Sequence, residues 1–277
     1  VSSEILAEDI EPFLCEGLDS YKLIFINGVF NKFLSILGSN EKFFVGSLKQ
    51  GMKEMPDIIN AHYGKLADTK QSLVALNTAM ANEGAFVYVK KGIKLDKLVQ
   101  ILFVNTNHEE SRMMQTRNLF VLEDFAEAQI FERHQAFNQG HVFSNSVTES
   151  SVGNQAHFKH FKLQNDLDSS SMVDSTFVKQ GANSSALVDT FAFSGELVRN
   201  NLHFEFTGMH AEAHMDAITL LKGKSLVDHH TFVDHAVPHC QSNQLYKGIY
   251  DEKSKGVFNG KVMVRKDAQK TNAFRQN

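Results

Sequence analysis

The chain has 277 residues, of which 42% are hydrophobic and 22% charged, and its formal net charge is −4 at pH 7. This composition is typical of a soluble globular protein with enough chain to bury a sizeable core. The near-neutral charge, without a long basic run, argues against a protein that binds nucleic acid or a membrane.

The two cysteines, Cys15 and Cys240, lie far apart and do not resemble the dense framework of a secreted disulfide protein. No apolar run reaches the length of a membrane span, and no secretory leader is visible. We therefore expect a cytoplasmic protein with two reduced thiols.

Residues 1–83 have the pattern of a small mixed α/β region. Residues 21–26 are predicted to form a strand because they are apolar and precede an Asn-Gly turn. Apolar residues at helical spacing predict two helices, at 30–37 and within 68–80.

Residues 84–277 have the pattern of a β-rich domain. Short runs rich in Val, Ile, Phe and Thr follow one another, and most neighbouring centres lie roughly 11 to 18 residues apart. The spacing favours a parallel β-helix, a flattened right-handed solenoid of about seven coils in which each strand pairs with its counterpart in the next coil. The predicted strands are 85–89, 100–105, 118–122, 128–133, 141–148, 155–163, 172–178, 186–193, 201–206, 213–221, 225–235, 243–250, 256–259 and 261–264.

The pattern alone leaves an antiparallel sandwich as the structural alternative. It is less favoured because Pro is absent between Pro56 and Pro238 and Asn-Gly turns occur only twice. The chain also has 23 Phe and no Trp, and an excess of Phe suits ladders of like residues that point into a solenoid. The Phe residues expected in such ladders are Phe158, Phe161, Phe177, Phe191, Phe193, Phe204, Phe206 and Phe232.

Histidine gathers in the second half of the chain, where His229, His230, His235 and His239 lie close together in sequence. Such a cluster has the composition of a metal site. In a strand, however, His229 and His235 would lie about 20 Å apart and could not share an ion. Two arrangements could still form a site. His residues of neighbouring coils could stack about 4.8 Å apart on one face and bridge an ion, or a turn after Pro238 could bring His235, His239 and Cys240 together, and these three are the candidate metal ligands. The alternative is that they are hydrogen-bonded ladder residues or surface residues.

Catalytic motifs are weak. The sequence has no Gly-x-Ser-x-Gly elbow, no phosphate-binding Gly-rich loop and no Cys-x-x-Cys pair, so we expect no enzyme. Asp189, Asp228 and Asp234 could supply the paired carboxylates of a sugar-cleaving β-helix enzyme, a polysaccharide lyase or hydrolase. The lack of Trp weakens this alternative, because sugar grooves usually contain aromatic platforms.

The run Asp-His-Ala-Val-Pro-His-Cys-Gln-Ser-Asn-Gln-Leu-Tyr-Lys-Gly at 234–248 strongly resembles the SufB/SufD family of iron–sulfur cluster assembly proteins. Similar matches occur at 75–79, 84–89, 197–202, 230–235, 256–262 and 267–274. Within these, Phe-Asn-Gly-Lys and Ala-Gln-Lys-Thr-Asn-Ala resemble the SufD branch rather than SufB.

The resemblance implies a right-handed parallel β-helix that acts as a scaffold and not by turnover. Its implied partners are a SufB homologue and a SufC-type ATPase. It implies no resident cofactor, although a nascent iron–sulfur cluster would pass transiently through the complex.

In SufD-like proteins a Cys-Ser-His segment and a helical part that contacts the ATPase follow the Ala-Gln-Lys-Thr stretch. This sequence ends at Asn277, before such a segment, so we expect an incomplete chain. A terminal coil leaves strand edges uncovered, which makes a homodimer plausible in isolation. A stand-alone metal-binding protein centred on His235, His239 and Cys240 stays open as a further alternative.

Overall fold

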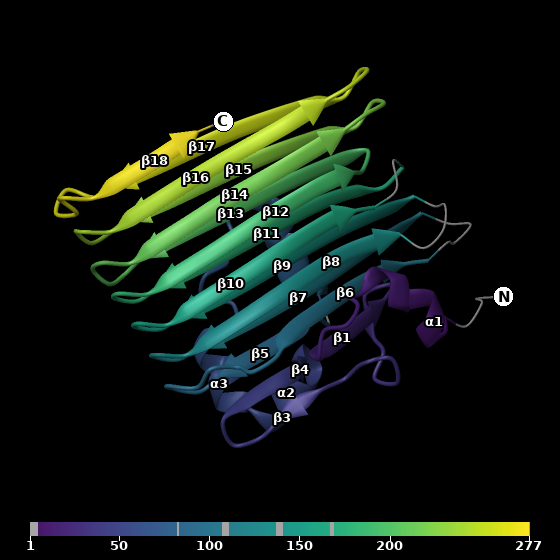
Figure 1. The fold of residues 1–277 in the computed structure, drawn as a ribbon, viewed down its shortest axis with the longest axis horizontal. Helices are drawn as coiled ribbons and strands as arrows, with labels where there is room; N and C mark the ends of the chain where they lie inside the picture. Colours follow the sequence, from purple (N-terminus) through teal and green to yellow (C-terminus); the bar gives the residue numbers. More distant parts are fainter. Residues whose placement is uncertain (1–4, 82, 107–110, 137–140, 167–168, 277) are drawn as a thin grey trace.

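The computed structural model describes residues 5–81, 83–106, 111–136, 141–166 and 169–276. These residues form a parallel β-solenoid of about six turns with a small N-terminal α/β region, which confirms the predicted fold class (Figure 1). Two sheets of nine strands form its walls, and from β5 onward successive strands alternate between them. We refer to the sheet with the even-numbered solenoid strands as sheet A and to the other as sheet B.

Sheet A has the strand order β18-β16-β14-β12-β10-β8-β6-β1-β2. Its solenoid strands are parallel and in register, apart from a shift at Gln164 and Asn165 at the end of β10. They are β6 (Leu98–Asn105), β8 (Glu127–Ala136), β10 (His157–Asn165), β12 (Ser185–Ser194), β14 (Glu212–Leu221), β16 (Gln241–Tyr250) and β18 (Asn272–Gln276).

Sheet B has the strand order β17-β15-β13-β11-β9-β7-β5-β4-β3. Its solenoid strands are parallel as well. They are β5 (Ala85–Val89), β7 (Arg112–Leu122), β9 (Val142–Val152), β11 (Ser171–Gln180), β13 (Leu197–Phe206), β15 (Leu226–His235) and β17 (Lys255–Val264).

The N-terminal region extends both sheets. Strand β1 pairs in parallel with β6, while β4 pairs antiparallel with β5. Side chains of β1 and β4 therefore pack in the same core as those of the solenoid strands. The elements of this region are α1 (Ala7–Ile10), the 3-10 helix η1 (Glu11–Phe13), β1 (Ser20–Ile26), β2 (Val29–Phe30), β3 (Gly38–Ser39), β4 (Phe43–Ser47), α2 (Leu48–Glu54), α3 (Pro56–His62) and α4 (Ser72–Met80).

The predicted strands correspond to β5 through β17. The two short runs expected at 256–259 and 261–264 are one ten-residue strand, β17, because Gly260 continues in register opposite Thr231. The solenoid has about six turns, where the spacing predicts about seven.

The helix predicted at 30–37 is wrong. Asn31 Oδ1 accepts hydrogen bonds from the backbone N–H groups of Phe33 and Leu34, and Ser35 Oγ donates to the Asn31 carbonyl. These local bonds replace helical ones, because Asn and Ser side chains compete for the backbone. Ile36 then pairs with Lys22 beside β1. The helix predicted within 68–80 is confirmed as α4.

Only some of the Phe residues fill inward ladders. Phe158, Phe204 and Phe206 are buried in the core between the sheets. The prediction is wrong for the other five, because strand parity turns them to the outer faces: Phe161, Phe177, Phe191, Phe193 and Phe232.

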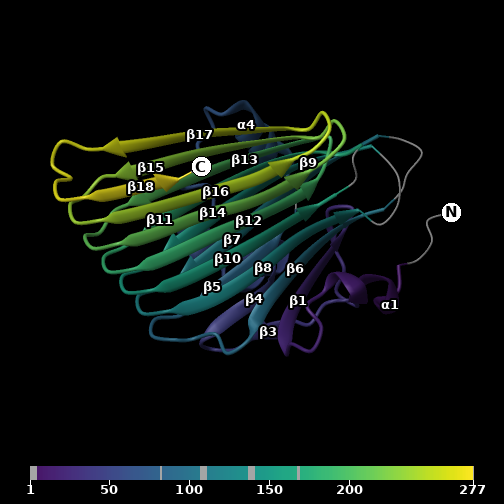
Figure 2. The ribbon, with the colours of Figure 1, turned by 45° about the horizontal axis from the view of Figure 1, so that its top comes forward.

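The helices cover unequal parts of the two outer faces. Helix α4 packs against β7 and β9 of sheet B, whereas the α1 segment packs over β1 and β6 of sheet A (Figures 1 and 2). In the described part of the chain, every helix is too short or too polar to cross a bilayer.

Candidate functional site

His235, at the end of β15, points into the solenoid and is fully buried. Its Nε2 lies 3.0 Å from Ser242 Oγ, and its Nδ1 lies 2.9 Å from Thr271 Oγ1. The Thr271 hydroxyl donates its one hydrogen to the Cys240 carbonyl, so Nδ1 of His235 donates and Nε2 accepts. Burial lowers the pKa of His235. The ring is therefore neutral, and both nitrogens are occupied by hydroxyl groups.

His239 occupies the turn between β15 and β16 and is exposed. Its backbone has a positive φ of 63°, and its ring stacks on His210 of the preceding turn at 5.1 Å between centroids. The turns before these hold Asn183 and Gln155, each with a positive φ of 55°. His239 thus belongs to a column of turn residues outside the coil.

Cys240 follows His239 but points inward and is buried. It lies in a column of small buried residues, one from each turn, that also contains Ala126, Ala156, Ser184 and Ala211. Its Sγ lies 3.4 Å from the Gly208 carbonyl, and burial raises the pKa of the thiol. A metal would require the thiolate, which this environment disfavours.

The structure therefore places two of the candidate ligands inside the coil and one outside. Among the described residues, no group of three His, Cys, Asp or Glu side chains could hold a metal ion. A joint ligand role for His235, His239 and Cys240 stays a prediction, one that needs these side chains to be rearranged.

A buried polar cluster that the sequence reasoning missed fills the middle of the solenoid. Glu132 bridges two histidines, with Oε1 2.7 Å from His134 Nε2 and Oε2 3.0 Å from His160 Nε2. Burial alone would raise the pKa of Glu132, but the Lys162 charge and the two histidine bonds hold it well below its usual range. Lys162 in turn pairs with Asp174.

The cluster continues toward the C-terminal coils. Gln164 and Asn200 exchange side-chain hydrogen bonds, and His229 lies 3.0 Å from Thr219 Oγ1. Strand parity could have revealed the cluster, because His160, Lys162 and Gln164 alternate in phase with the buried Phe158. The interior of this solenoid thus contains both an apolar core and a cluster of buried polar side chains that are joined by hydrogen bonds.

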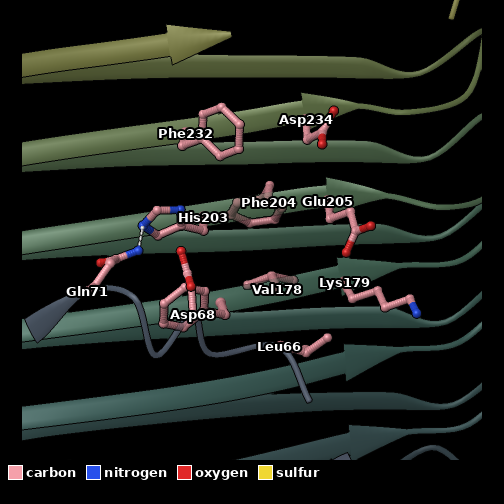
Figure 3. A pocket seen from close by; sticks show the side chains of 11 residues that line it. Leu66, Asp68, Gln71, Val178, Lys179, His203, Phe204, Glu205, Phe232 and Asp234 are labelled. Atoms are coloured by element: carbon pink, nitrogen blue, oxygen red, sulfur yellow. Dashed lines mark hydrogen bonds between the residues drawn. The ribbon is translucent and has the colours of Figure 1, made fainter. Parts of the chain in front are cut away.

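A cavity of about 310 Å³ lies between the loop before α4 and the outer face of sheet B (Figure 3). His203 stacks on Phe177 with 4.7 Å between ring centroids, and its Nε2 lies 3.5 Å from Gln71 Nε2. Burial lowers the pKa of His203 to about 4, so this ring is neutral at physiological pH. The cavity is a small aromatic pocket with charged side chains at its rim.

The three aspartates suggested for sugar cleavage are not arranged as a catalytic pair. Asp228 is 2.7 Å from Arg199, and Asp234 is 2.7 Å from Arg265, so both are held in ion pairs. Six residues apart on one strand, they lie about 20 Å from each other, beyond the separation that glycosidases use. Asp189 lies on the other sheet.

These features define a β-solenoid protein with a cluster of hydrogen-bonded polar groups inside the coil and with outer faces that the described helices cover only in part. Residues 3–101 match the family model of the SufBD protein N-terminal region, and residues 103–277 match the SufBD core domain of SUF system FeS cluster assembly. The chain belongs to the SufBD family.

Three relatives show how far the similarity extends. A Synechocystis protein named as an iron–sulfur cluster assembly SufBD family protein is 29% identical over 276 residues, and the iron–sulfur cluster assembly protein SufD of Escherichia coli is 25% identical over 276 residues. These alignments cover 96% of this chain and 61% and 62% of the relatives. The chloroplastic protein ABCI7 of Arabidopsis thaliana is 27% identical over 83% of this chain and 53% of its own length. The chain thus spans about three-fifths of the first two relatives.

Proposed function

We propose that this protein is a SufD-like component of an iron–sulfur cluster assembly scaffold that works by pairing with a SufB homologue and a SufC-type ATPase. The observation that carries the proposal is the match of both parts of the chain to SufBD models. The SufD-like segments at 256–262 and 267–274 favour the SufD branch.

The surface of the last coils is compatible with a role in binding. Strands β17 and β18 are the outermost strands of the described residues, and most of their side chains are exposed. Unpaired strand edges of this kind require a partner or a covering segment. In the proposed role, iron and sulfide are cargo of the complex, the protein itself turns over no substrate, and the setting is the cytoplasm.

Co-expression with the SufB homologue of the same organism tests the proposal. We expect a stable heterodimer by size-exclusion chromatography with light scattering, and addition of the SufC-type ATPase should extend the complex. Failure of the chain to bind the SufB homologue at micromolar concentration would contradict the proposal. If the chain pairs with a second copy of itself, the SufB homologue should displace that copy.

Metal analysis after anaerobic purification separates the scaffold from a stand-alone metal-binding protein. Because no described three-ligand group exists, we expect less than one-tenth equivalent of iron or zinc on the isolated chain. Stoichiometric metal that is lost in Cys240→Ser would favour the metal-binding alternative instead.

A further inference from the structure

The outer face of sheet A carries an uncovered apolar surface on β12, β14 and β16. Figure 1 shows this face without a helix over these strands. Ile218 on the central strand β14 is 46% exposed, and Ile249 near the end of β16 is 68% exposed. We call the following residues the sheet A surface: Phe191, Phe193, Ile218, Leu220, Leu245 and Ile249. A contiguous exposed apolar surface usually marks an interaction site.

Two carboxylates lie in the floor of this surface. Asp189 on β12 is the register partner of Asp216 on β14, so the two side chains stack at the strand spacing of about 4.8 Å. Together with the surrounding apolar residues they line a shallow cavity of about 520 Å³. The like charges therefore face the same small space.

Neither carboxylate is paired with a cation in the described chain, although Lys247 lines the same cavity and His214 lies near both aspartates. Among the described residues, neither carboxylate takes part in an ion pair with Lys or Arg, and Asp189 Oδ1 is buried without a hydrogen-bond partner. Asp216 Oδ1 accepts only the backbone N–H of Leu245, at 3.1 Å. Burial and the neighbouring Asp216 charge raise the pKa of Asp189 to about 6.

Two aspartates on the other wall of the solenoid, in contrast, form ion pairs with arginine. On sheet B, Asp228 is paired with Arg199 and Asp234 with Arg265. Two stacked carboxylates without a cation are unfavourable in apolar surroundings, unless a cation from outside completes them. Lys247 lines the same cavity but forms no ion pair with either carboxylate, so both stay open to a basic side chain from outside.

We propose that the sheet A surface binds an amphipathic helix of a partner protein, whose apolar face covers Ile218 and Leu245 and which places one Arg or Lys between Asp189 and Asp216. A helix fits because a strand would add to a sheet edge, whereas a flat sheet face packs a helix. A nucleic acid or an anionic membrane does not fit, because the carboxylates would repel it. This surface is distinct from the strand edges of β17 and β18, so the proposal does not rest on the proposed function.

A display library of 20-residue helices with randomised faces, selected on the whole chain, tests the proposal. We expect enriched peptides to carry one Arg or Lys flanked by apolar residues three or four positions away. We also expect the best peptide to lose at least tenfold in affinity when that residue is replaced by the neutral isostere citrulline. No enrichment, or enriched helices without a basic residue, would overturn the proposal.

Variants of the chain locate the binding. In the Asp189→Asn/Asp216→Asn double variant, the tenfold preference for the basic peptide should disappear, and Ile218→Ser should weaken both peptides. Glu205→Gln, which removes an exposed carboxylate from sheet B, is the matched control and should bind as the wild type does. Circular dichroism and urea unfolding establish that each variant is folded. A preference that persists in the double variant would place the helix elsewhere.

Discussion

At the scale of single residues, a buried ion pair between Arg117 on β7 and Glu149 on β9 supports the attachment of the N-terminal region to the solenoid. The two side chains are almost completely buried, with Nη2 2.6 Å from Oε2. The Glu149 carboxylate also accepts the backbone N–H groups of Gly64, Leu66 and Ala67. One carboxylate thus fixes the loop before α4 to sheet B.

Glu149→Gln should destabilise the protein by about 3–5 kcal/mol, because it leaves the buried Arg117 charge without its partner. Urea unfolding followed by circular dichroism measures this change. Lys94→Ala, which removes an exposed ion pair with Glu127, serves as the control and should change stability by less than about 1 kcal/mol. Equal effects of the two variants would show that the buried pair does not anchor the loop.

Asp189→Asn should stabilise the chain near pH 7.5, by up to about 1 kcal/mol after allowance for its partial exposure. The pKa of Asp189 is raised to about 6, so the folded state holds its proton more tightly than the unfolded state does. The stability that this proton provides is present at low pH and is lost as the pH rises through 6. Urea unfolding at pH 4.5 and 7.5 should show a smaller difference between variant and wild type at pH 4.5.

At the scale of elements, strand positions could be predicted because each strand is bounded by turn residues and carries β-branched or aromatic side chains. The face that a polar side chain occupies was harder to predict. Lys162 and Glu132 look like surface residues by type, yet they compensate one another inside the coil. Likewise, His239 and Cys240 are neighbours in sequence, but the turn directs one outward and the other inward.

Substitutions of His239 test whether this position in the turn between β15 and β16 serves the turn geometry or binds a metal. Its positive φ favours Gly and disfavours β-branched residues. His239→Gly should therefore keep stability within about 1 kcal/mol, whereas His239→Val should cost about 1–3 kcal/mol. Thermal unfolding of both variants distinguishes the two roles. Equal loss of stability and of bound metal in both would instead indicate a ligand.

At the scale of the whole molecule, the fold and the family could be predicted from sequence, but the apolar surface of sheet A could not. Spacing predicts that strands stack, and a family run such as 234–248 predicts which solenoid they form. Neither predicts that Phe161, Asp189 and Asp216 lie opposite one another on β10, β12 and β14. Their contact depends on the register between coils, which the sequence pattern does not specify.

Buried neutral histidines should make the whole protein sensitive to acid. Burial lowers the pKa values of His203 and His229 to about 4, below the ordinary value of 6.5, so the unfolded state takes up protons first. The stability associated with each is complete above pH 6.5 and is lost as the pH falls toward 4. Between pH 7.5 and 5 we expect a loss of about 1–2 kcal/mol per histidine in urea unfolding. The loss should be smaller in His229→Gln, and an unchanged slope would contradict the assignment.

The two ends of the solenoid are not equivalent. At the N-terminal end, the two-residue antiparallel strands β2 and β3 each cover part of the edges of β1 and β4, whereas among the described residues β17 and β18 have no strand beyond them. Because the N-terminal end leaves the ribosome first, each described coil emerges after the coil with which its strands pair. During synthesis we therefore expect the described coils to pair in chain order, each on the strand edges of the coil before it.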